Sequence, residues 1–288
     1  MIDCAALNQD KRVTRLIVNA DDFGYFECVS RGILQGAKSG SITATGIMAN
    51  CPDFQERVSW LSSVEHVDAG VHLNVTYGYP LSKTMASKLS FNQGKFVGKF
   101  EVVKALLKGT LEVPSILEEW RWQIDKCQAS GIQLYFLNSH EHLHMLPPLF
   151  EGTHRLAEEF AIPFVRFSST EWKGRLTFAG LVRNVLMESM NIVNKTKNDV
   201  STPHKMVGLN ESGCLNLHYL ERIVPAMDSE HIYELMCHPG FFDAKEITDQ
   251  KLLQYHRWEE ELDALLSSEF ASLCAKYRVQ LAGYRNLV

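Results

Sequence analysis

The sequence predicts an α/β protein folded as a single, distorted (β/α) barrel with seven or eight parallel strands. Short β-rich runs alternate with longer helical stretches almost from end to end of the 288 residues. Parallel neighbours need a crossover connection, and a helix between two strands supplies one. No Pro/Gly/Ser-rich linker divides the chain. We therefore expect one domain over residues 1–288, with 1–13 as a flexible N-terminal extension.

Each element in the first half of the chain has a local reason. The run 15–20 (RLIVNA) is mostly apolar, which is typical of a buried strand. The stretch 27–38 has apolar residues at helical spacing and is followed by Gly40, which favours termination. Residues 77–98 are rich in Gly, Ser, Lys and Asn and predict a long functional loop. The remaining elements expected here are strands at 42–48 and 69–75, and helices at 54–61 (after Asp53 as its cap), 100–107 and 115–129.

The same alternation continues in the second half. The run 133–138 (QLYFLN) predicts a strand, and a helix over 149–160 follows the pair Pro147–Pro148. The stretch 254–277 has the pattern of one long amphipathic helix. The other elements expected here are strands at 163–167, 231–238 and 279–283, and helices at 176–193 and 217–227.

Composition excludes several classes of function. Lys and Arg total 29 against 34 Asp and Glu, a formal net charge of −5, so the chain lacks the basic surface that nucleic-acid binding needs. No apolar run approaches the roughly 18 residues of a membrane span, and residues 1–15 lack a signal-peptide core. The seven cysteines include no CxxC pair, which is typical of buried thiols in a reducing compartment. We expect a cytoplasmic protein.

Acids and histidines lie at or just beyond the ends of four of the predicted strands. In a barrel of this kind the carboxyl ends of the strands carry the catalytic residues. Each feature alone has a structural explanation, as a helix cap, a core histidine or a turn residue. Their coincidence at one end of successive strands favours a functional site. The residues are Asp21 and Asp22, His72 and Asn74, His140 to His144, and His238.

Two short motifs match known catalytic signatures, but their context in this sequence disfavours those functions. Asp22-Phe23-Gly24 matches the DFG tripeptide of protein kinases, but it lies too near the start of the chain to follow an ATP-binding lobe. The run His140–His144 matches the HExxH pattern of zinc peptidases, which needs a helix to bring both histidines to one face. Strand-like residues precede this run and Pro147 follows it, which disfavours a helix. If the segment stays extended, its three histidines share a face.

The residue types at these strand ends suit metal-assisted hydrolysis. One carboxylate and two histidines are a usual ligand set for a catalytic divalent ion with one position open for water. Such an ion lowers the pKa of that water and polarises a substrate carbonyl group. A second carboxylate can serve as general base and a further histidine as general acid. Hydrolysis of an amide or ester fits this set, and phosphoester hydrolysis stays open.

Four blocks of the sequence resemble the YdjC-like (ChbG/HpnK) carbohydrate deacetylases. They match in order and spacing over about residues 15–284, and they are IVNADDFG at 17–24, GVHLN at 70–74, SHEHLHM at 139–145 and ELMCHPG at 234–240. The resemblance implies a distorted (β/α) barrel. It also implies metal-dependent removal of an acetyl group from an N-acetylated amino sugar, in which metal-bound water attacks the amide carbonyl.

The resemblance assigns roles residue by residue. It implies three metal ligands, which are Asp22, His72 and His140. It makes Asp21 the general base. It makes His238 the general acid or a group that stabilises the intermediate. The expected cofactor is one divalent ion, Zn²⁺ or Mg²⁺; the mixed Asp/His donor set favours zinc, and the resemblance allows either.

One position departs from the family pattern. The family commonly reads DSHxHxH or DGHxHxH, whereas this chain has Asn138 at the leading position. An Asn can accept a hydrogen bond from a histidine ligand but brings no charge, so a lower metal affinity is expected. The choice between His140 and His142 as the ligand stays open. An inactive sugar-binding relative is therefore an alternative, beside a peptidase or a phosphoesterase.

Substrate contacts are expected from Asn74, His144 and Arg166, and a structural salt bridge is an equal alternative for Arg166. The resemblance implies a chito-oligosaccharide or a lipid-linked amino sugar as substrate. The apolar helix 176–193 is expected to pack on the barrel, with contact to a lipid tail or a membrane surface as the alternative. A homodimer is the base-rate expectation for oligomeric state.

Overall fold

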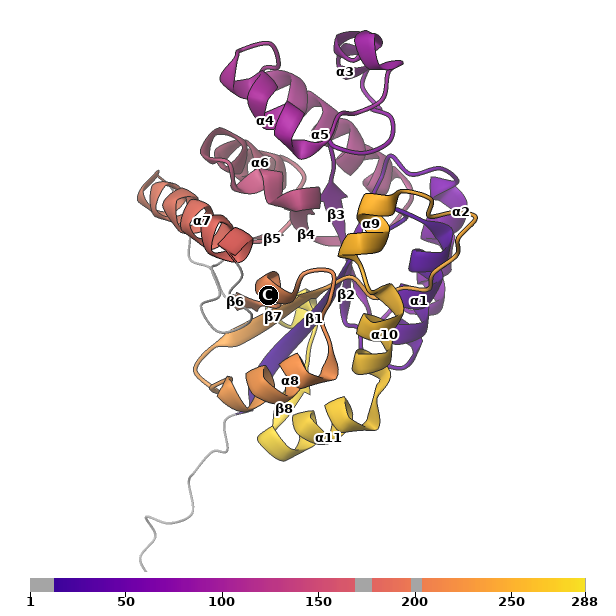
Figure 1. Cartoon of the computed structure of the whole chain (residues 1–288), viewed down its shortest axis with the longest axis vertical. Helices are drawn as coiled ribbons and strands as arrows, with labels where there is room; N and C mark the ends of the chain where they lie inside the picture. Colours follow the sequence, from indigo (N-terminus) through magenta and orange to yellow (C-terminus); the bar gives the residue numbers. More distant parts are fainter. Residues whose placement is uncertain (1–12, 169–177, 198–203, 288) are drawn as a thin grey trace, which may run out of the picture.

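The computed structural model describes residues 13–168, 178–197 and 204–287, and its centre is one curled sheet of parallel strands (Figure 1). The strand order is β5-β4-β3-β2-β1-β7-β6, and β8 pairs with β1 beside this path. Because β5 and β6 form the two ends of the path, the sheet is an open half-barrel, which confirms the predicted distorted barrel. The strands are β1 Thr14–Phe23, β2 Ala44–Ile47, β3 Asp68–Leu73, β4 Leu134–Ser139, β5 Phe164–Val165, β6 His204–Val207, β7 Ile232–Cys237 and β8 Val279–Leu281.

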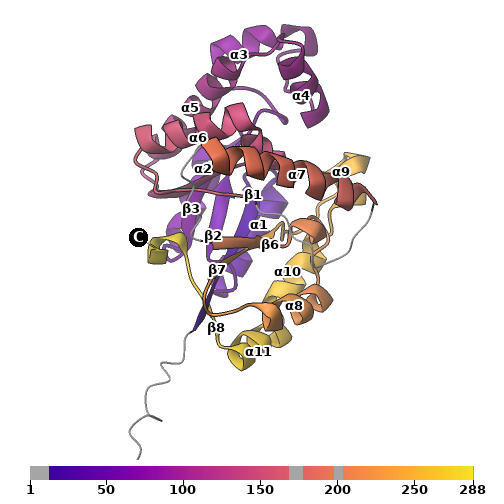
Figure 2. The ribbon, with the colours of Figure 1, turned by 90° about the vertical axis from the view of Figure 1, so that its left-hand side faces the viewer.

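Helices flank the sheet, because each crossover between parallel strands carries at least one (Figure 2). The predicted helix 27–38 is confirmed with both of its ends. Figures 1 and 2 both place α3 and α4 at one end of the molecule, beyond α5. The helices are α1 Glu27–Lys38, α2 Phe54–Ser59, α3 Lys83–Lys88, α4 Lys99–Leu107, α5 Val113–Ala129, α6 Pro147–Glu159, α7 Phe178–Lys197, α8 Leu217–Ile223, α9 Gln250–Tyr255, α10 Trp258–Leu266 and α11 Ser268–Tyr277.

The central strand β1 is buried on both faces, as its apolar run predicts. Leu16 and Val18 belong to the main hydrophobic core. The residue between them, Ile17, packs instead in a smaller cluster with Phe136 and Tyr284. This alternation follows from the two-residue period of a strand. The second face therefore continues through Asn19 to Asp21 at the carboxyl end.

The predicted single helix over 254–277 is wrong, because the structure has three helices there. Extended backbone at His256 (φ −98°, ψ 144°) separates α9 from α10. Ser267 (φ −66°, ψ 146°) separates α10 from α11, and its hydroxyl accepts a hydrogen bond from the Phe270 N–H as an N-cap. The amphipathic spacing continues through both breaks. Periodicity alone therefore predicts one helix, although local capping divides the segment into three.

Two further expectations need correction. The predicted loop 77–98 contains the short helix α3, whose first turn is capped by Ser82 through its hydroxyl and the Met85 N–H. Asp53 precedes α2 as predicted, but it is left-handed (φ 52°) and its side chain makes no capping hydrogen bond. The strand β6 was not predicted, because its four residues carry little periodic signal. The predicted extension 1–13 lies outside the described residues except for Val13.

Helix α7 packs on the barrel, as predicted, through part of its apolar surface. Met187 is in the core beside Phe167 and Met145. Leu181 and Leu186 are exposed, so the two leucines of this helix do not take part in that packing. The first two residues of the predicted range 176–193 lie outside the described residues. Within the part of the chain that the structure describes, no helix is long and apolar enough to cross a membrane.

Candidate metal centre

The end of β1 brings two adjacent carboxylates to one histidine. Neighbouring strand residues ordinarily point to opposite faces. Here the register with β2 shifts between Ala20 and Phe23, and Asp22 has a φ of 71°. As a result Asp21 Oδ1 lies 3.6 Å from His72 Nδ1, and Asp22 Oδ1 lies 3.2 Å from His72 Nε2.

Asp22, His72 and His140 form one compact cluster. Each offers a ligand atom, and these atoms lie within 4.8 Å of one another. His72 is on β3, whereas His140 begins the turn that follows β4 and places its Nδ1 3.0 Å from Asp22 Oδ1. Burial alone would raise the pKa of Asp22, but the charges and hydrogen bonds of His140 and His72 together outweigh it and hold this pKa well below its usual value. Burial opposes charge on His140 as well, yet the Asp22 carboxylate raises the pKa of His140.

These three residues fit a divalent metal ion. One carboxylate oxygen in contact with two imidazole nitrogens is a three-ligand set that leaves a coordination position open. The other nitrogen of His72 donates to Asn138 Oδ1 at 2.7 Å, which directs His72 Nε2 to the cluster. Asp22 at 1% and His72 at 3% exposure are shielded from water.

Asn138 connects the cluster to the second carboxylate. It is the register partner of His72 on the adjacent strand β4, so the two side chains share a face of the sheet. Its amide nitrogen donates to Asp21 Oδ1 at 2.8 Å. The space for this pair comes from Gly46 on β2, where a Cβ atom would lie 3.1 Å from His72 Cβ and 3.3 Å from Asn138 Oδ1.

Asp21 is held by a buried arginine. Arg166 Nη1 and Nη2 lie 2.6 and 3.1 Å from the two oxygens of Asp21, and Arg166 Nε lies 2.6 Å from Glu234 Oε1. Asn19 donates a further hydrogen bond to Asp21 Oδ1. Burial would raise the pKa of Asp21, but the charge and hydrogen bonds of Arg166, together with the charges of His72 and His238, outweigh it and keep this pKa well below its ordinary value. The sequence left two roles open for Arg166, a substrate contact and a structural salt bridge. In the structure Arg166 forms the salt bridge.

The three histidines after β4 each contact a different partner. Glu141 and His142 both have a φ of 56°, so the run forms neither an α-helix nor an extended strand. The prediction against a helix is confirmed, and the shared face expected for an extended segment does not form. His142 Nδ1 pairs with Ser168 Oγ at 2.8 Å. His144 accepts from Ser139 Oγ through Nδ1 and donates to a backbone oxygen through Nε2. Burial lowers the pKa of His144 to about 3, so this residue is a neutral structural group.

His238 follows β7 on the same side of the sheet. Its backbone N–H donates to Glu261 Oε2 at 2.5 Å, and its ring lies 5.2 Å from that of His256, which in turn stacks on Trp258. Burial lowers the pKa of His238, against the opposing charges of Asp22 and Asp21. The imidazole is therefore neutral near pH 7.

The residues expected to contact substrate are all fully buried, namely Asn74, His144 and Arg166. Asn74 Oδ1 accepts from the Thr76 and Tyr77 N–H groups, and its Nδ2 donates to Asn50 Oδ1. It therefore shapes the loop after β3. All three residues therefore support the site from buried positions.

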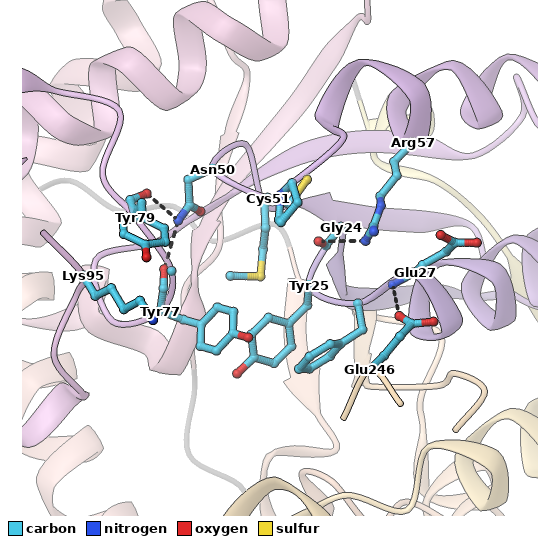
Figure 3. A pocket seen from close by; sticks show the side chains of 14 residues that line it. Gly24, Tyr25, Glu27, Asn50, Cys51, Arg57, Tyr77, Tyr79, Lys95 and Glu246 are labelled. Carbon is cyan, nitrogen blue, oxygen red and sulfur yellow. Dashed lines mark hydrogen bonds between the residues drawn. The ribbon is translucent and has the colours of Figure 1, made fainter. Parts of the chain in front are cut away.

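A cavity of about 410 Å³ is lined by Gly24 and Tyr25, which follow the cluster residue Asp22 in the chain, and by residues of other elements (Figure 3). Tyr25, Tyr77 and Tyr79 supply aromatic rings to its lining, and Lys95 and Glu246 supply charged groups. The ring of Tyr25 also lies 5.3 Å from that of His140. The loop 77–98 was expected to be functional, and part of it lines this cavity.

Sequence reasoning missed several supporting residues. Asn19 and Glu234 are polar positions inside apolar strands, and that interruption is a signal that the sequence contains. Asn19 also lies two residues before Asp21, on the same strand face. Ser168, His256 and Glu261 carry no comparable local signal, because their partners come from other elements.

Fold and cluster together define an α/β half-barrel protein with a buried Asp/His group at the carboxyl ends of its strands. The family model described as YdjC-like protein matches residues 15–276, and the chain belongs to this family. The resemblance carried by the four sequence blocks is thereby confirmed.

The chain is similar to proteins named carbohydrate deacetylase. It is 26% identical to one from Clostridium beijerinckii, with 95% of this chain and all of the relative covered. It is 27% identical to one from Brevibacillus brevis, with 95% and 99% covered. A crystal structure from Enterococcus faecalis, provisionally described as a cellobiose-phosphate cleavage protein, superposes with a TM-score of 0.74 at 22% identity, covering 96% of this chain and 99% of the other. This last likeness supports the fold.

Proposed function

We propose that this protein is a metal-dependent carbohydrate N-deacetylase that hydrolyses the N-acetyl group of an amino sugar. The observation that carries the proposal is the convergence of Asp21 and Asp22 on the two nitrogens of His72, with His140 completing the group. The relatives named carbohydrate deacetylase cover nearly the whole chain and support the substrate class. His140 contacts Asp22, whereas His144 contacts the backbone oxygen of Arg166. These different partners disfavour a zinc peptidase.

Asp22, His72 and His140 would hold a divalent ion, which when bound supplies Lewis-acid activation of a water molecule and of the acetyl carbonyl group. Asp21 is ionised and held in place by Arg166, so its carboxylate takes the proton that the water loses. The same carboxyl group then delivers this proton to the nitrogen of the departing amine.

His238 contributes as a hydrogen-bond donor. Its lowered pKa makes it a neutral imidazole at rest, which favours stabilisation of the developing oxyanion over proton delivery to the amine. Its backbone is fixed by Glu261, so the donor is preorganised. Arg166 acts through Asp21 and Glu234 as a positioning residue.

Acetate release from a panel of N-acetylated sugars, free, oligomeric and lipid-linked, tests the proposal. We expect release by the wild-type protein, loss on chelation with recovery on adding Zn²⁺ or Mg²⁺, and a fall of about 10²–10⁴-fold in Asp21→Asn. Asp125→Asn is the matched control, because Asp125 is an exposed residue of α5. A protein that binds the ion but releases no acetate from any sugar would overturn the proposal, and assays of peptide and phosphate release would follow.

A further inference from the structure

We propose that the end of the molecule formed by α3 and α4 docks on the anionic headgroups of a lipid bilayer. We call residues 83–108 the tip, because they run from the first residue of α3 to the residue after α4. Figures 1 and 2 both place α3 and α4 at the end of the molecule opposite α11. The tip contains none of the residues proposed to bind the metal ion or to move a proton, so this inference is independent of the proposed reaction.

The most exposed large apolar side chains among the described residues belong to the tip. Phe91, Phe100 and Leu107 are 77%, 79% and 84% exposed, whereas the next, Leu186 on α7, is 61% exposed. Because an α-helix has 3.6 residues per turn, Phe100 and Leu107, seven positions apart on α4, lie on one face. Val102 is buried on the opposite face. Helix α4 therefore packs on the protein through one face and presents apolar side chains on the other.

The tip is basic, whereas the whole chain is acidic. It has one acidic residue, Glu101, and six lysines, so its formal charge is +5 against −5 for the chain. Near an anionic lipid surface each lysine strengthens binding by about fivefold, so this charge favours such a surface. The lysines are Lys83, Lys88, Lys95, Lys99, Lys104 and Lys108.

Half of these lysines form ion pairs at the surface of the molecule. The pairs are Lys88–Glu112, Lys99–Glu141 and Lys104–Glu101. Pairs at a surface contribute little to stability, so a lipid phosphate can replace the carboxylate. The other three lysines have no carboxylate partner in the part of the chain that the structure describes.

The charge of the tip disfavours a second copy of the chain as the partner. Lys104 and Lys108 lie four and eight positions after Phe100, beside the apolar stripe of α4. The acidic residue of this helix, Glu101, already pairs with Lys104. A dimer formed tip to tip would bring two surfaces of the same positive charge together, which costs free energy.

The apolar side chains fit a bilayer better than they fit an acidic protein. Phe100 and Leu107 each project separately from the surface, as their high exposure shows. Protein interfaces instead bury a close-packed apolar core. In a bilayer the phenyl ring and the isobutyl group enter the hydrocarbon, while the flexible lysine side chains reach back to the headgroups. Helix α4 then lies parallel to the membrane surface.

Flotation of the full-length protein with lipid vesicles tests the inference. The probes are vesicles of phosphatidylcholine alone and vesicles of phosphatidylcholine and phosphatidylglycerol at about 2:1. We expect the wild-type protein to bind the anionic vesicles at least about tenfold more tightly than the neutral ones, and to lose most of this preference at about 1 M salt.

Two double variants separate the apolar from the electrostatic contribution. Phe100→Ser/Leu107→Ser should bind the anionic vesicles at least about tenfold more weakly, because both apolar anchors are lost. Lys104→Gln/Lys108→Gln should bind them about 25-fold more weakly and depend less on salt. Leu186→Ser is the matched control, because it removes an exposed leucine from α7 and should bind like the wild type. Circular dichroism should show the same fold for all variants, since every changed side chain is exposed.

Several results overturn the inference. One is a wild-type protein that does not bind anionic vesicles, and another is a Phe100→Ser/Leu107→Ser protein that binds them like the wild type. Loss of vesicle binding in Leu186→Ser overturns it as well, because the contact then depends on α7. If sedimentation equilibrium shows a wild-type dimer that Phe100→Ser/Leu107→Ser lacks, and no vesicles bind, the partner is a second copy. Binding of soluble polyglutamate without binding of vesicles makes the partner an acidic protein.

Discussion

Asn138 Oδ1 accepts a hydrogen bond from His72 Nδ1 at 2.7 Å, while the amide nitrogen of Asn138 donates to Asp21. One uncharged side chain thus orients the proposed metal ligand and supports the proposed base. A carboxylate could accept from His72, but ionised it could not donate to Asp21. The departure from the family pattern therefore keeps the orienting hydrogen bond, and it avoids a third carboxylate in this cluster.

Asn138→Ala is expected to weaken Zn²⁺ binding by about 10–100-fold, because His72 loses the partner that fixes its ring. Titration calorimetry on the metal-free protein measures this. Asn138→Asp keeps an acceptor for His72 and should hold Zn²⁺ within about threefold of the wild-type affinity. Equal weakening in both variants would contradict the orienting role.

Arg166→Met is expected to destabilise the protein by about 3–5 kcal/mol, because it leaves the buried Asp21 and Glu234 carboxylates without their cation. Urea unfolding measures the loss. Arg121→Met is the control, since Arg121 pairs with Glu159 on the exposed surface and should cost less than about 1 kcal/mol. If the two variants lose similar free energies of unfolding, the buried ion pairs of Arg166 stabilise the protein no more than an exposed pair does.

Glu261 should make the folded state less stable as the pH rises from about 4.5 to about 8. Burial raises the pKa of Glu261 to about 8 from an ordinary value of 4.5, so the folded state holds a proton that the unfolded state has released. The stabilisation is complete below pH 4.5 and is lost as the pH rises towards 8, by about 5 kcal/mol in all.

The measurement is urea unfolding of the wild-type protein and of Glu261→Gln at pH 5 and pH 8. Glu261→Gln keeps a neutral acceptor for the His238 N–H and should flatten the loss. If the free energy of unfolding changes with pH to the same extent in both proteins, Glu261 is not the cause of the pH dependence.

Two neighbouring residues of α7 should differ sharply in stability effect. Met187→Ala opens a cavity beside Phe167 and should cost about 2–3 kcal/mol. Leu186→Ala truncates a side chain that is 61% exposed and should stay within about 0.5 kcal/mol of the wild type. Thermal or urea unfolding of both variants checks this, and a larger cost for Leu186→Ala would mean that its side chain is covered in solution.

Periodicity predicted most of the fold, because each helix or strand buries a face that its own residues define. The strands that carry Asp21 and His72, the strand before His140 and the helix 27–38 are examples. Predictions failed where local capping or a short edge strand decided the outcome. The breaks at His256 and Ser267 follow from extended backbone that leaves the apolar spacing unchanged.

The sequence by itself determined the α/β class and which acids and histidines lie at the ends of the strands, since both depend on short-range spacing. Only the tertiary structure decided which of these side chains meet. It set Arg166 against Asp21 across 145 positions, and it brought His140 rather than His142 to Asp22. The physical reason is that strand register and the left-handed turn after β4 fix these contacts, and both are set by elements far apart in the chain.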